Sequence, residues 1–315
     1  MTLVDMKQRL GRSARGFSLT WRYLFNLAPT LSYWLDRPAL SGEAARVVAD
    51  LNRDGVAITS AQALLGPVSC YGELCATVER LKLSLSEQLA GARAHADNLD
   101  AVGEKTFMVE YLGKYPVLDP DEIYTRFALQ KNILQIANAY LGMYTRLRYY
   151  NVWQTFSTKI DARESQLWHR DREDRLILKM FVYLSDVDDG AGPFTYAPGS
   201  HPKGRLRREP AYFLEGHVKR STDSQMADII PPEQWIKGIG PKGTIIFADT
   251  RGYHKGGLAR ERDRLMYTCM FTSRASQSVE FLKREKSFTL PSDKAQAFAL
   301  ADPEQRAWTI WKLAR

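Results

Sequence analysis

The hydrophobic pattern of the chain changes at Gly142. Before it, apolar residues recur at helical spacing over 43–53, over 72–94, and from Asp119-Pro120 to Gly142. After it, short segments rich in Tyr, Val, Ile, Phe, Trp and Thr alternate with clusters of Gly, Pro and Asp, at 146–156, 166–169, 176–187, 193–197, 243–248 and 265–272. Helices followed by a run of strands predict an α+β chain whose core is a β-sandwich or barrel.

The ends of the chain carry further signals. Residues 1–42 form a basic, aromatic extension, and 43–315 is predicted to be one domain, with a helical part at about 43–142, a β core at about 144–274 and a C-terminal helix at about 302–314. Two interpretations of residues 1–40 are open: an amphipathic element lying on anionic lipid, or a helical extension packed on the domain. Its aromatic residues are scattered rather than confined to one stripe, which favours packing.

The chain has 44 basic and 36 acidic residues, a net charge of +8, which suggests an anionic partner. No nucleic-acid recognition motif accompanies the charge, so we expect a small-molecule or lipid-like, possibly anionic, substrate and no nucleic acid. Three cysteines without a CxxC spacing argue against a disulfide framework and a structural zinc site. With neither a signal peptide nor a run of about 18 apolar residues, the expected location is cytoplasmic. No sequence pattern indicates the oligomeric state.

The β half contains Trp168-His169-Arg170-Asp171. His and Asp two residues apart on an extended chain project to the same side and can bind one metal ion. The motif is weak alone, but one more histidine would complete a two-histidine, one-carboxylate site with open positions for substrate, oxygen or water. His254 follows the predicted strand 243–248, and Arg264 begins the next one. A guanidinium at this offset suits a co-substrate that chelates the metal at one end and carries a carboxylate at the other.

Further motifs stand in a fixed order along the chain: the entry Val48–Val56, the Trp168–Asp171 motif, Tyr183–Gly190 followed by Gly192-Pro193-Phe194, Pro198-Gly199-Ser200-His201, and His254 with Arg264. From about Val47 to Thr272 the sequence thereby resembles the phytanoyl-CoA dioxygenase-like branch of the iron(II)/2-oxoglutarate oxygenases.

That resemblance implies a double-stranded β-helix (jelly roll) with the site inside its open end. It implies Fe(II) held by His169, Asp171 and His254, and 2-oxoglutarate held through its C5 carboxylate by Arg264, with O2 as the other co-substrate. The expected reaction is hydroxylation with decarboxylation of 2-oxoglutarate to succinate. Halogenating members lack the carboxylate ligand, so Asp171 favours hydroxylation, while desaturation or cyclisation remain open.

The sequence departs from the family pattern at two points. Gly256 stands where relatives often have a hydroxyl residue that helps hold the C5 carboxylate, and the arginine follows the histidine at ten residues rather than the frequent eleven. Arg260 and Arg262 therefore compete with Arg264. Two other functions stay open: a non-catalytic metal-binding sensor, and a cupin-like isomerase or dioxygenase that needs no keto acid.

Several other residues have a structural and a functional interpretation. We expect Lys179 to point to solvent rather than to an anion in the barrel, and Tyr149 and Trp153 to pack in the core rather than line the cavity. His201 is expected to shape a turn, His95 and His217 to be ordinary residues, and Cys269 to be buried and inert. The basic run 203–208 is expected to be a solvated loop, with docking of an anionic substrate as the alternative.

Overall fold

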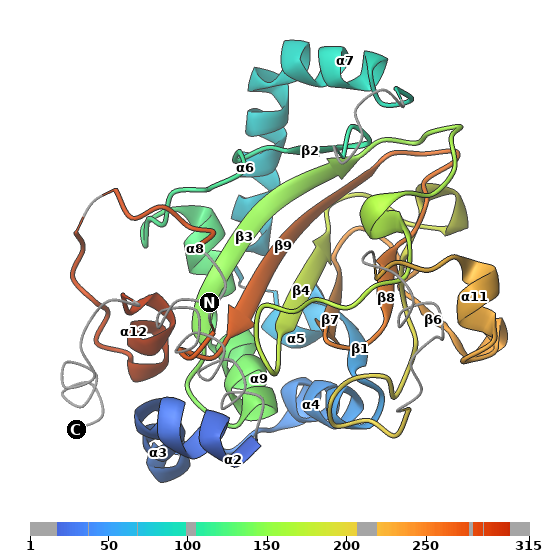
Figure 1. The fold of residues 1–315 in the computed structure, drawn as a ribbon. Helices are drawn as coiled ribbons and strands as arrows, with labels where there is room; N and C mark the ends of the chain where they lie inside the picture. Colours follow the sequence, from blue (N-terminus) through green and yellow to red (C-terminus); the bar gives the residue numbers. More distant parts are fainter. Residues whose placement is uncertain are drawn as a thin grey trace, which may run out of the picture.

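A computed structural model describes residues 18–36, 38–67, 69–98, 105–206, 219–276, 280–285 and 287–302. Its centre is a pair of antiparallel sheets that form the expected double-stranded β-helix (Figure 1). The larger sheet has the strand order β1-β7-β4-β9-β3-β2, and the smaller has the order β6-β5-β8. Strands that are distant in sequence are neighbours in both sheets, which is how the residues of one site are gathered from several segments.

The strands are short except for two, which run side by side across the larger sheet. β3 (Arg146–Thr155) and β9 (Arg264–Thr272) pair over almost their full length, with a register shift between Leu147 and Tyr149. The other strands are β1 (Val56–Ser60), β2 (Met108–Glu110), β4 (Leu178–Tyr183), β5 (Phe194–Tyr196), β6 (Ile236–Lys237), β7 (Thr244–Asp249) and β8 (His254–Gly256). β3, β4, β5, β7 and β9 lie within predicted segments to within one residue, whereas the sequence segments given above do not include the short β1, β2, β6 and β8.

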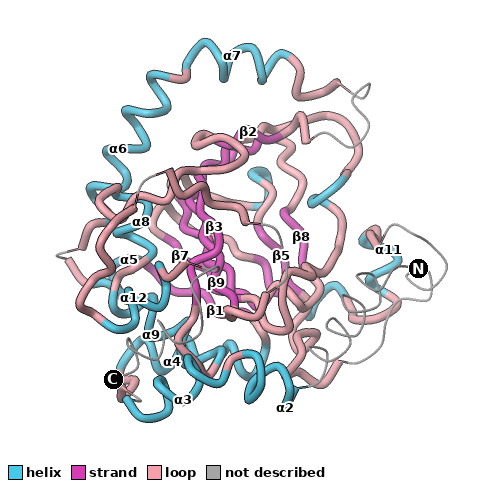
Figure 2. Tube along the Cα trace, turned by 60° about the vertical axis from the view of Figure 1, so that its left-hand side comes forward, coloured by secondary structure: helices cyan, strands magenta, loops and turns pink. Residues whose placement is uncertain are grey.

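Helices cover one side of the larger sheet (Figure 2). The apolar face of α4 (Gly42–Asp54) packs on β1 and on α9 (Lys131–Leu141), and each of these two helices ends at a left-handed glycine, Gly55 and Gly142. The remaining helices are α2 (Ser18–Thr20), η1 (Trp21–Phe25), α3 (Leu27–Asp36), α5 (Ala61–Leu65), α6 (Tyr71–Ser84), α7 (Ser86–Ala94), α8 (Ile123–Ala128), η2 (Glu164–Gln166), η3 (Asp189–Ala191), α11 (Asp223–Ala227), η4 (Pro232–Gln234) and α12 (Lys294–Leu300).

Two predicted helices were wrong in detail. The helix expected over 72–94 is two helices, and the Ser84 hydroxyl donates to the Leu81 carbonyl where the first one ends. The helix expected from Asp119 begins only at Ile123, because the Asp119 carboxylate accepts from Asp121 N and forms a turn instead of a cap. It is also divided, since α8 ends at Ala128 and α9 begins at Lys131.

The segment 166–169 is not a strand but makes isolated bridges, from Trp168 to Ser221 and from His169 to His254. The predicted helix 302–314 falls almost entirely outside the described residues. The division into 1–42 and 43–315 stays a prediction.

The described part of the N-terminal extension packs on the domain through two aromatic side chains. The buried Trp21 indole donates to Asp174 Oδ1 at 2.8 Å, and the Tyr33 ring meets Tyr144 edge to face. Other large apolar side chains of the segment are exposed: Leu19, Tyr23, Leu24, Leu27, Trp34 and Leu35. Packing was the favoured interpretation, and contact of residues 1–40 with a lipid surface stays the untested alternative. None of the described helices is long and apolar enough to cross a membrane.

Candidate metal centre

His169, Asp171 and His254 come together at one end of a cavity. Their ligand atoms all lie within 4.8 Å of one another, and no other such group of three exists among the described residues. Two backbone hydrogen bonds hold the two histidines side by side: His169 N to His254 O at 2.9 Å, and His254 N to His169 O at 3.0 Å. Asp171 N donates to Thr250 O at 2.8 Å. The folded backbone thus fixes all three side chains before any metal binds.

The second nitrogen of each imidazole sets its orientation. His169 Nδ1 lies 2.8 Å from Leu167 O, and His254 Nδ1 lies 3.0 Å from Gly252 O. A carbonyl accepts only from a protonated nitrogen, so each Nε2 keeps its lone pair. Each Nε2 lies 3.8 Å from an oxygen of Asp171. Two neutral nitrogens and one carboxylate converge here, a donor set suited to a divalent transition metal.

The charges of the site support that protonation. Burial lowers the pKa of both histidines, so both are neutral near pH 7. Burial raises the pKa of Asp171, but the adjacent Lys179 ammonium lowers it by more, and the net pKa lies far below its usual range. The carboxylate is therefore ionised and ready to bind a cation.

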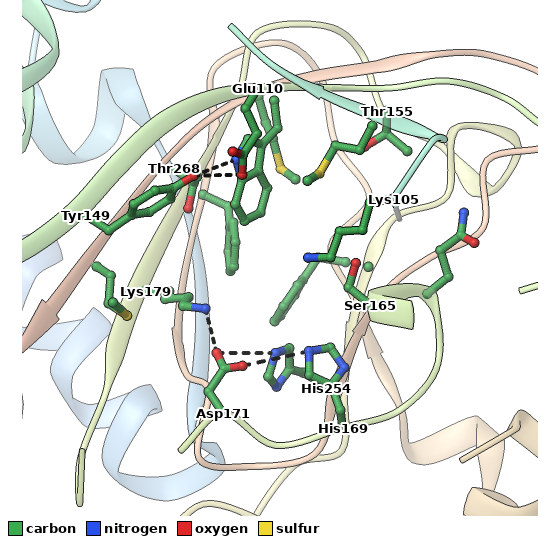
Figure 3. Close-up of a pocket in the computed structure, with 18 of the residues that line it drawn as sticks. Lys105, Glu110, Tyr149, Thr155, Ser165, His169, Asp171, Lys179, His254 and Thr268 are labelled. Carbon is green, nitrogen blue, oxygen red and sulfur yellow. Dashed lines mark hydrogen bonds and ion pairs between the residues drawn. The ribbon is translucent and has the colours of Figure 1, made fainter. Parts of the chain in front are cut away.

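Lys179 does not point to solvent, so that prediction was wrong. Its Nζ lies 2.6 Å from Asp171 Oδ2 inside the cavity (Figure 3). Burial lowers the pKa of this lysine, but Asp171 raises it more, so the ammonium stays charged. The pair neutralises the carboxylate when no metal is present.

Arg264 is the one of the three candidate arginines that faces the cavity. It is 3% exposed, and its Nε and Nη1 have no hydrogen-bond partner among the described residues. Arg260 instead donates to the carbonyls of Thr158 and Ile160, and the exposed Arg262 pairs with Asp188. A buried guanidinium with free N–H groups is costly unless an anion joins it, which makes Arg264 the best candidate to bind a carboxylate.

The cavity has a volume of about 350 Å³ and is lined largely by apolar side chains (Figure 3). Along β9, every second residue faces it: Arg264, Met266, Thr268 and Met270. Tyr149 and Trp153 of β3 also line it, so the expectation of plain core packing was incomplete. Lys105, Glu110 and Arg220 line the cavity as well, and no spacing pattern in the sequence marks them.

The other singled-out residues have structural roles or lie elsewhere. His201 is fully buried, with Nε2 3.3 Å from Asn52 O, in the turn after β5. His95 is exposed, His217 lies outside the described residues, and Cys269 is buried, which raises the pKa of its thiol. Lys203 donates to Asn52 Oδ1 and Tyr140 O, so the first residue of the basic run 203–208 is bound to the fold rather than free to dock a substrate.

No protein-family model matches the chain, and no curated protein matches it. The resemblance to phytanoyl-CoA dioxygenases therefore stays a prediction. Among solved structures, the chain is similar to the epimerase SnoN in complex with Fe3+, alpha ketoglutarate and nogalamycin RO (19% identity, 78% of this chain and 95% of that one, TM-score 0.46). It is also similar to EctD from S. alaskensis with 2-oxoglutarate and 5-hydroxyectoine (16%, 80% and 84%, 0.49), and to HygX from Streptomyces hygroscopicus with nickel and 2-oxoglutarate (16%, 75% and 88%, 0.48). These likenesses are distant, and the chemistry of the site has to be inferred from its own residues.

Proposed function

We propose that this chain is a non-haem iron(II)- and 2-oxoglutarate-dependent dioxygenase that hydroxylates a small molecule. The observation that carries the proposal is the pairing of two features in one cavity. Two imidazole Nε2 atoms and the Asp171 carboxylate converge at one end, and a buried arginine with unpaired N–H groups lines the same space. A keto acid with a remote carboxylate can bridge these two features, whereas a metal site for sensing needs no such arginine.

The residues present fit both groups. His169, Asp171 and His254 would hold iron(II), since their donor atoms are deprotonated and face the cavity. Arg264 would bind the C5 carboxylate of 2-oxoglutarate, since its guanidinium is buried and its Nε and Nη1 lack a partner among the described residues. Bound iron with its keto acid and O2 supplies oxygen activation coupled to decarboxylation to succinate.

The remaining residues position and protect these groups. The carbonyls of Leu167 and Gly252 hold the two imidazoles in the tautomer that presents Nε2. Lys179 keeps Asp171 ionised, and the apolar residues of β4 and β9 exclude water from the reacting atoms. Gly256 leaves room beside the guanidinium, because a Cβ there would lie 3.5 Å from Arg264 Nη2.

The test is succinate formation from 2-oxoglutarate with iron(II) and O2. His169→Ala should abolish it. Arg264→Met should raise the KM for 2-oxoglutarate about 100-fold or more, since two hydrogen bonds to a charged group are worth roughly 1.5–3 kcal/mol each. Arg262→Met is the matched control and should leave the KM unchanged, because its exposed guanidinium pairs with Asp188.

Other outcomes would identify another function. Tight metal binding without any succinate would favour a binding or sensing protein. Activity of Arg264→Met in the absence of 2-oxoglutarate would favour an isomerase or a dioxygenase that needs no keto acid. Mass analysis of the substrate separates hydroxylation, a gain of one oxygen, from desaturation or cyclisation, a loss of two hydrogens.

Gly256 offers a second measurement on the same subsite. Gly256→Ser would place a hydroxyl beside Arg264, and the Cβ meets only ordinary contacts there. We expect a lower KM for 2-oxoglutarate in Gly256→Ser than in Gly256→Ala. Equal values in both variants would argue that the C5 carboxylate binds elsewhere.

A further inference from the structure

The cavity holds more cationic hydrogen-bond donors than the metal and the keto acid would use. Lys179 pairs with Asp171, and Arg264 is assigned to the C5 carboxylate in the proposed function. Lys105 and Arg220 also line the cavity and belong to neither group. The surroundings of these two side chains indicate what they bind.

Lys105 lies just before β2 and points into the cavity, above the histidines and Lys179 (Figure 3). No hydrogen bond or ion pair joins its ammonium to another described residue. Lys105 as a whole is exposed to solvent, and partial desolvation of its ammonium, with the nearby charge of Lys179, lowers its pKa. The backbone is held in place because Arg163 donates to Thr106 Oγ1 and lies over the Phe107 ring. An unpaired ammonium therefore faces the site from a segment whose backbone is held in place.

Arg220 reaches the same wall from another segment. The next residue, Ser221, exchanges two backbone hydrogen bonds with Trp168, which places Arg220 beside the metal-binding stretch. Its Nη1 is buried without a partner among the described residues, and its Nη2 makes only a long contact of 3.5 Å with Glu164.

A third donor without a partner lines the same cavity. Gln166 is 3% exposed and lines the cavity, and its Oε1 accepts from Arg163 N while its Nε2 has no partner among the described residues. Leaving a buried donor unpaired costs about 1–3 kcal/mol. Two buried donors without a partner, Arg220 Nη1 and Gln166 Nε2, lie in one cavity with the Lys105 ammonium, and an acceptor that arrives with a ligand best explains them.

The acids of the cavity are not that acceptor. Glu110 accepts from the Tyr149 hydroxyl at 3.1 Å, and burial raises the pKa of its carboxyl, which favours the neutral form. Glu173 accepts from Arg172 N at 2.8 Å. Neither forms an ion pair with Lys105 or Arg220 in the described part of the chain, so this wall stays cationic.

We infer that Lys105 and Arg220, with Gln166, form an oxyanion subsite that binds the carboxylate or phosphate of the substrate. The rest of the cavity is apolar and suits an aliphatic or aromatic body: Phe107, Met108, Trp153, Met266, Met270 and Phe281. The substrate class is an amphiphilic oxyanion. The donors by themselves require only an anionic ligand. That this ligand is the substrate of the enzyme rests on the proposed function.

The test is binding of three probes of similar shape to protein loaded with Mn(II) and 2-oxoglutarate, measured by titration calorimetry. The probes are 4-phenylbutyrate, 4-phenylbutanamide and 4-phenylbutylamine. The carboxylate should bind at least about ten-fold more tightly than the amide, given the strength of charge-assisted hydrogen bonds. A fourth probe, 3-phenylpropyl phosphate, decides which oxyanion the subsite prefers.

Lys105→Met and Arg220→Met should each weaken the carboxylate about ten-fold and leave the amide within two-fold, and Lys105→Arg should restore most of the loss. Lys114→Met is the matched control: this cation also lines the cavity but lies over the Tyr115 ring, and its loss should not affect the carboxylate. Unchanged amide binding shows that a variant has kept its fold.

Equal binding of carboxylate and amide by the unaltered protein would overturn the inference. So would tighter binding of the amine, which would assign recognition to Glu110. A loss of 2-oxoglutarate affinity in Arg220→Met without a change for the probe would place Arg220 in the co-substrate site. Absence of succinate formation together with intact carboxylate selectivity would refute the proposed function alone.

Discussion

The ion pair between Lys179 and Asp171 should stabilise the metal-free protein by far more than an exposed pair of the same geometry. Nζ lies 2.6 Å from Oδ2, and the two side chains are 16% and 12% exposed. Lys237 and Asp189 are also 2.6 Å apart, but they are 48% and 68% exposed. Removing one partner of a buried pair costs about 3–5 kcal/mol, whereas an exposed pair is worth about 0–1 kcal/mol.

We therefore expect Lys179→Met to lower the free energy of unfolding in EDTA by about 3–5 kcal/mol, and Lys237→Met by less than about 1 kcal/mol. Methionine keeps most of the lysine stem, so the difference isolates the charge. A divalent metal bound at the triad would replace the lysine as the cation facing Asp171. The cost of Lys179→Met should then shrink when Mn(II) is added.

The assay is urea denaturation of the three proteins in EDTA and in Mn(II). By linkage, a larger metal-induced stabilisation in Lys179→Met means that this variant binds the metal more tightly than the unaltered protein. Two results would refute the reasoning. One is a loss in EDTA no larger than that of Lys237→Met. The other is a loss that is the same with and without Mn(II).

Two further perturbations test the fold around the site. Burial raises the pKa of Asp249 from 3.8 to about 6, so the folded chain holds this proton more tightly than the unfolded chain. Stability should fall by about 2.4 kcal/mol as pH rises from 4 to 7. Asp249→Asn should remove that fall, as urea denaturation at a series of pH values would show; a fall of equal size in the variant would contradict it. Gly192 has φ +67°, and a Cβ there would lie 2.4 Å from Gly257 O, whereas Gly113 has φ +73° with open space around it. Gly192→Ala should therefore lower the unfolding free energy by about 1–3 kcal/mol more than Gly113→Ala in thermal or urea denaturation. Equal losses in the two variants would mean that the positive φ, and not the steric clash at Gly192, accounts for the lost stability.

The sequence was sufficient to find the triad because its signals are local. His169 and Asp171 are two residues apart, and His254 follows a strand whose apolar run is unmistakable. The three side chains come together only because His169 forms a β-bridge with His254, and no local sequence pattern predicts that bridge. The overall fold class was predictable for the same reason, since it depends on the order of helical and strand-like segments.

Lys105 and Arg220 could not be found in this way. Neither belongs to a motif, and each lies next to a strand or bridge too short to predict. Lys105 is placed by the contact of Thr106 with Arg163, and Arg220 by the bridge from Ser221 to Trp168. Both placements join segments about 50 residues apart or more, so they are properties of tertiary packing.

The orientation of Lys179 could not be predicted because it depends on the register between two strands. Alternation along β4 places Lys179 and Phe181 on the same face of the sheet, but it does not determine whether that face lines the cavity. The register with β9 does, because Lys179 lies opposite Met270, and directly opposed residues point to the same side of a sheet. Met270 in turn has the parity of Arg264, which faces the cavity. A shift of one residue in that register would turn Lys179 away from Asp171, so the pairing of two strands determines the charge at the metal site.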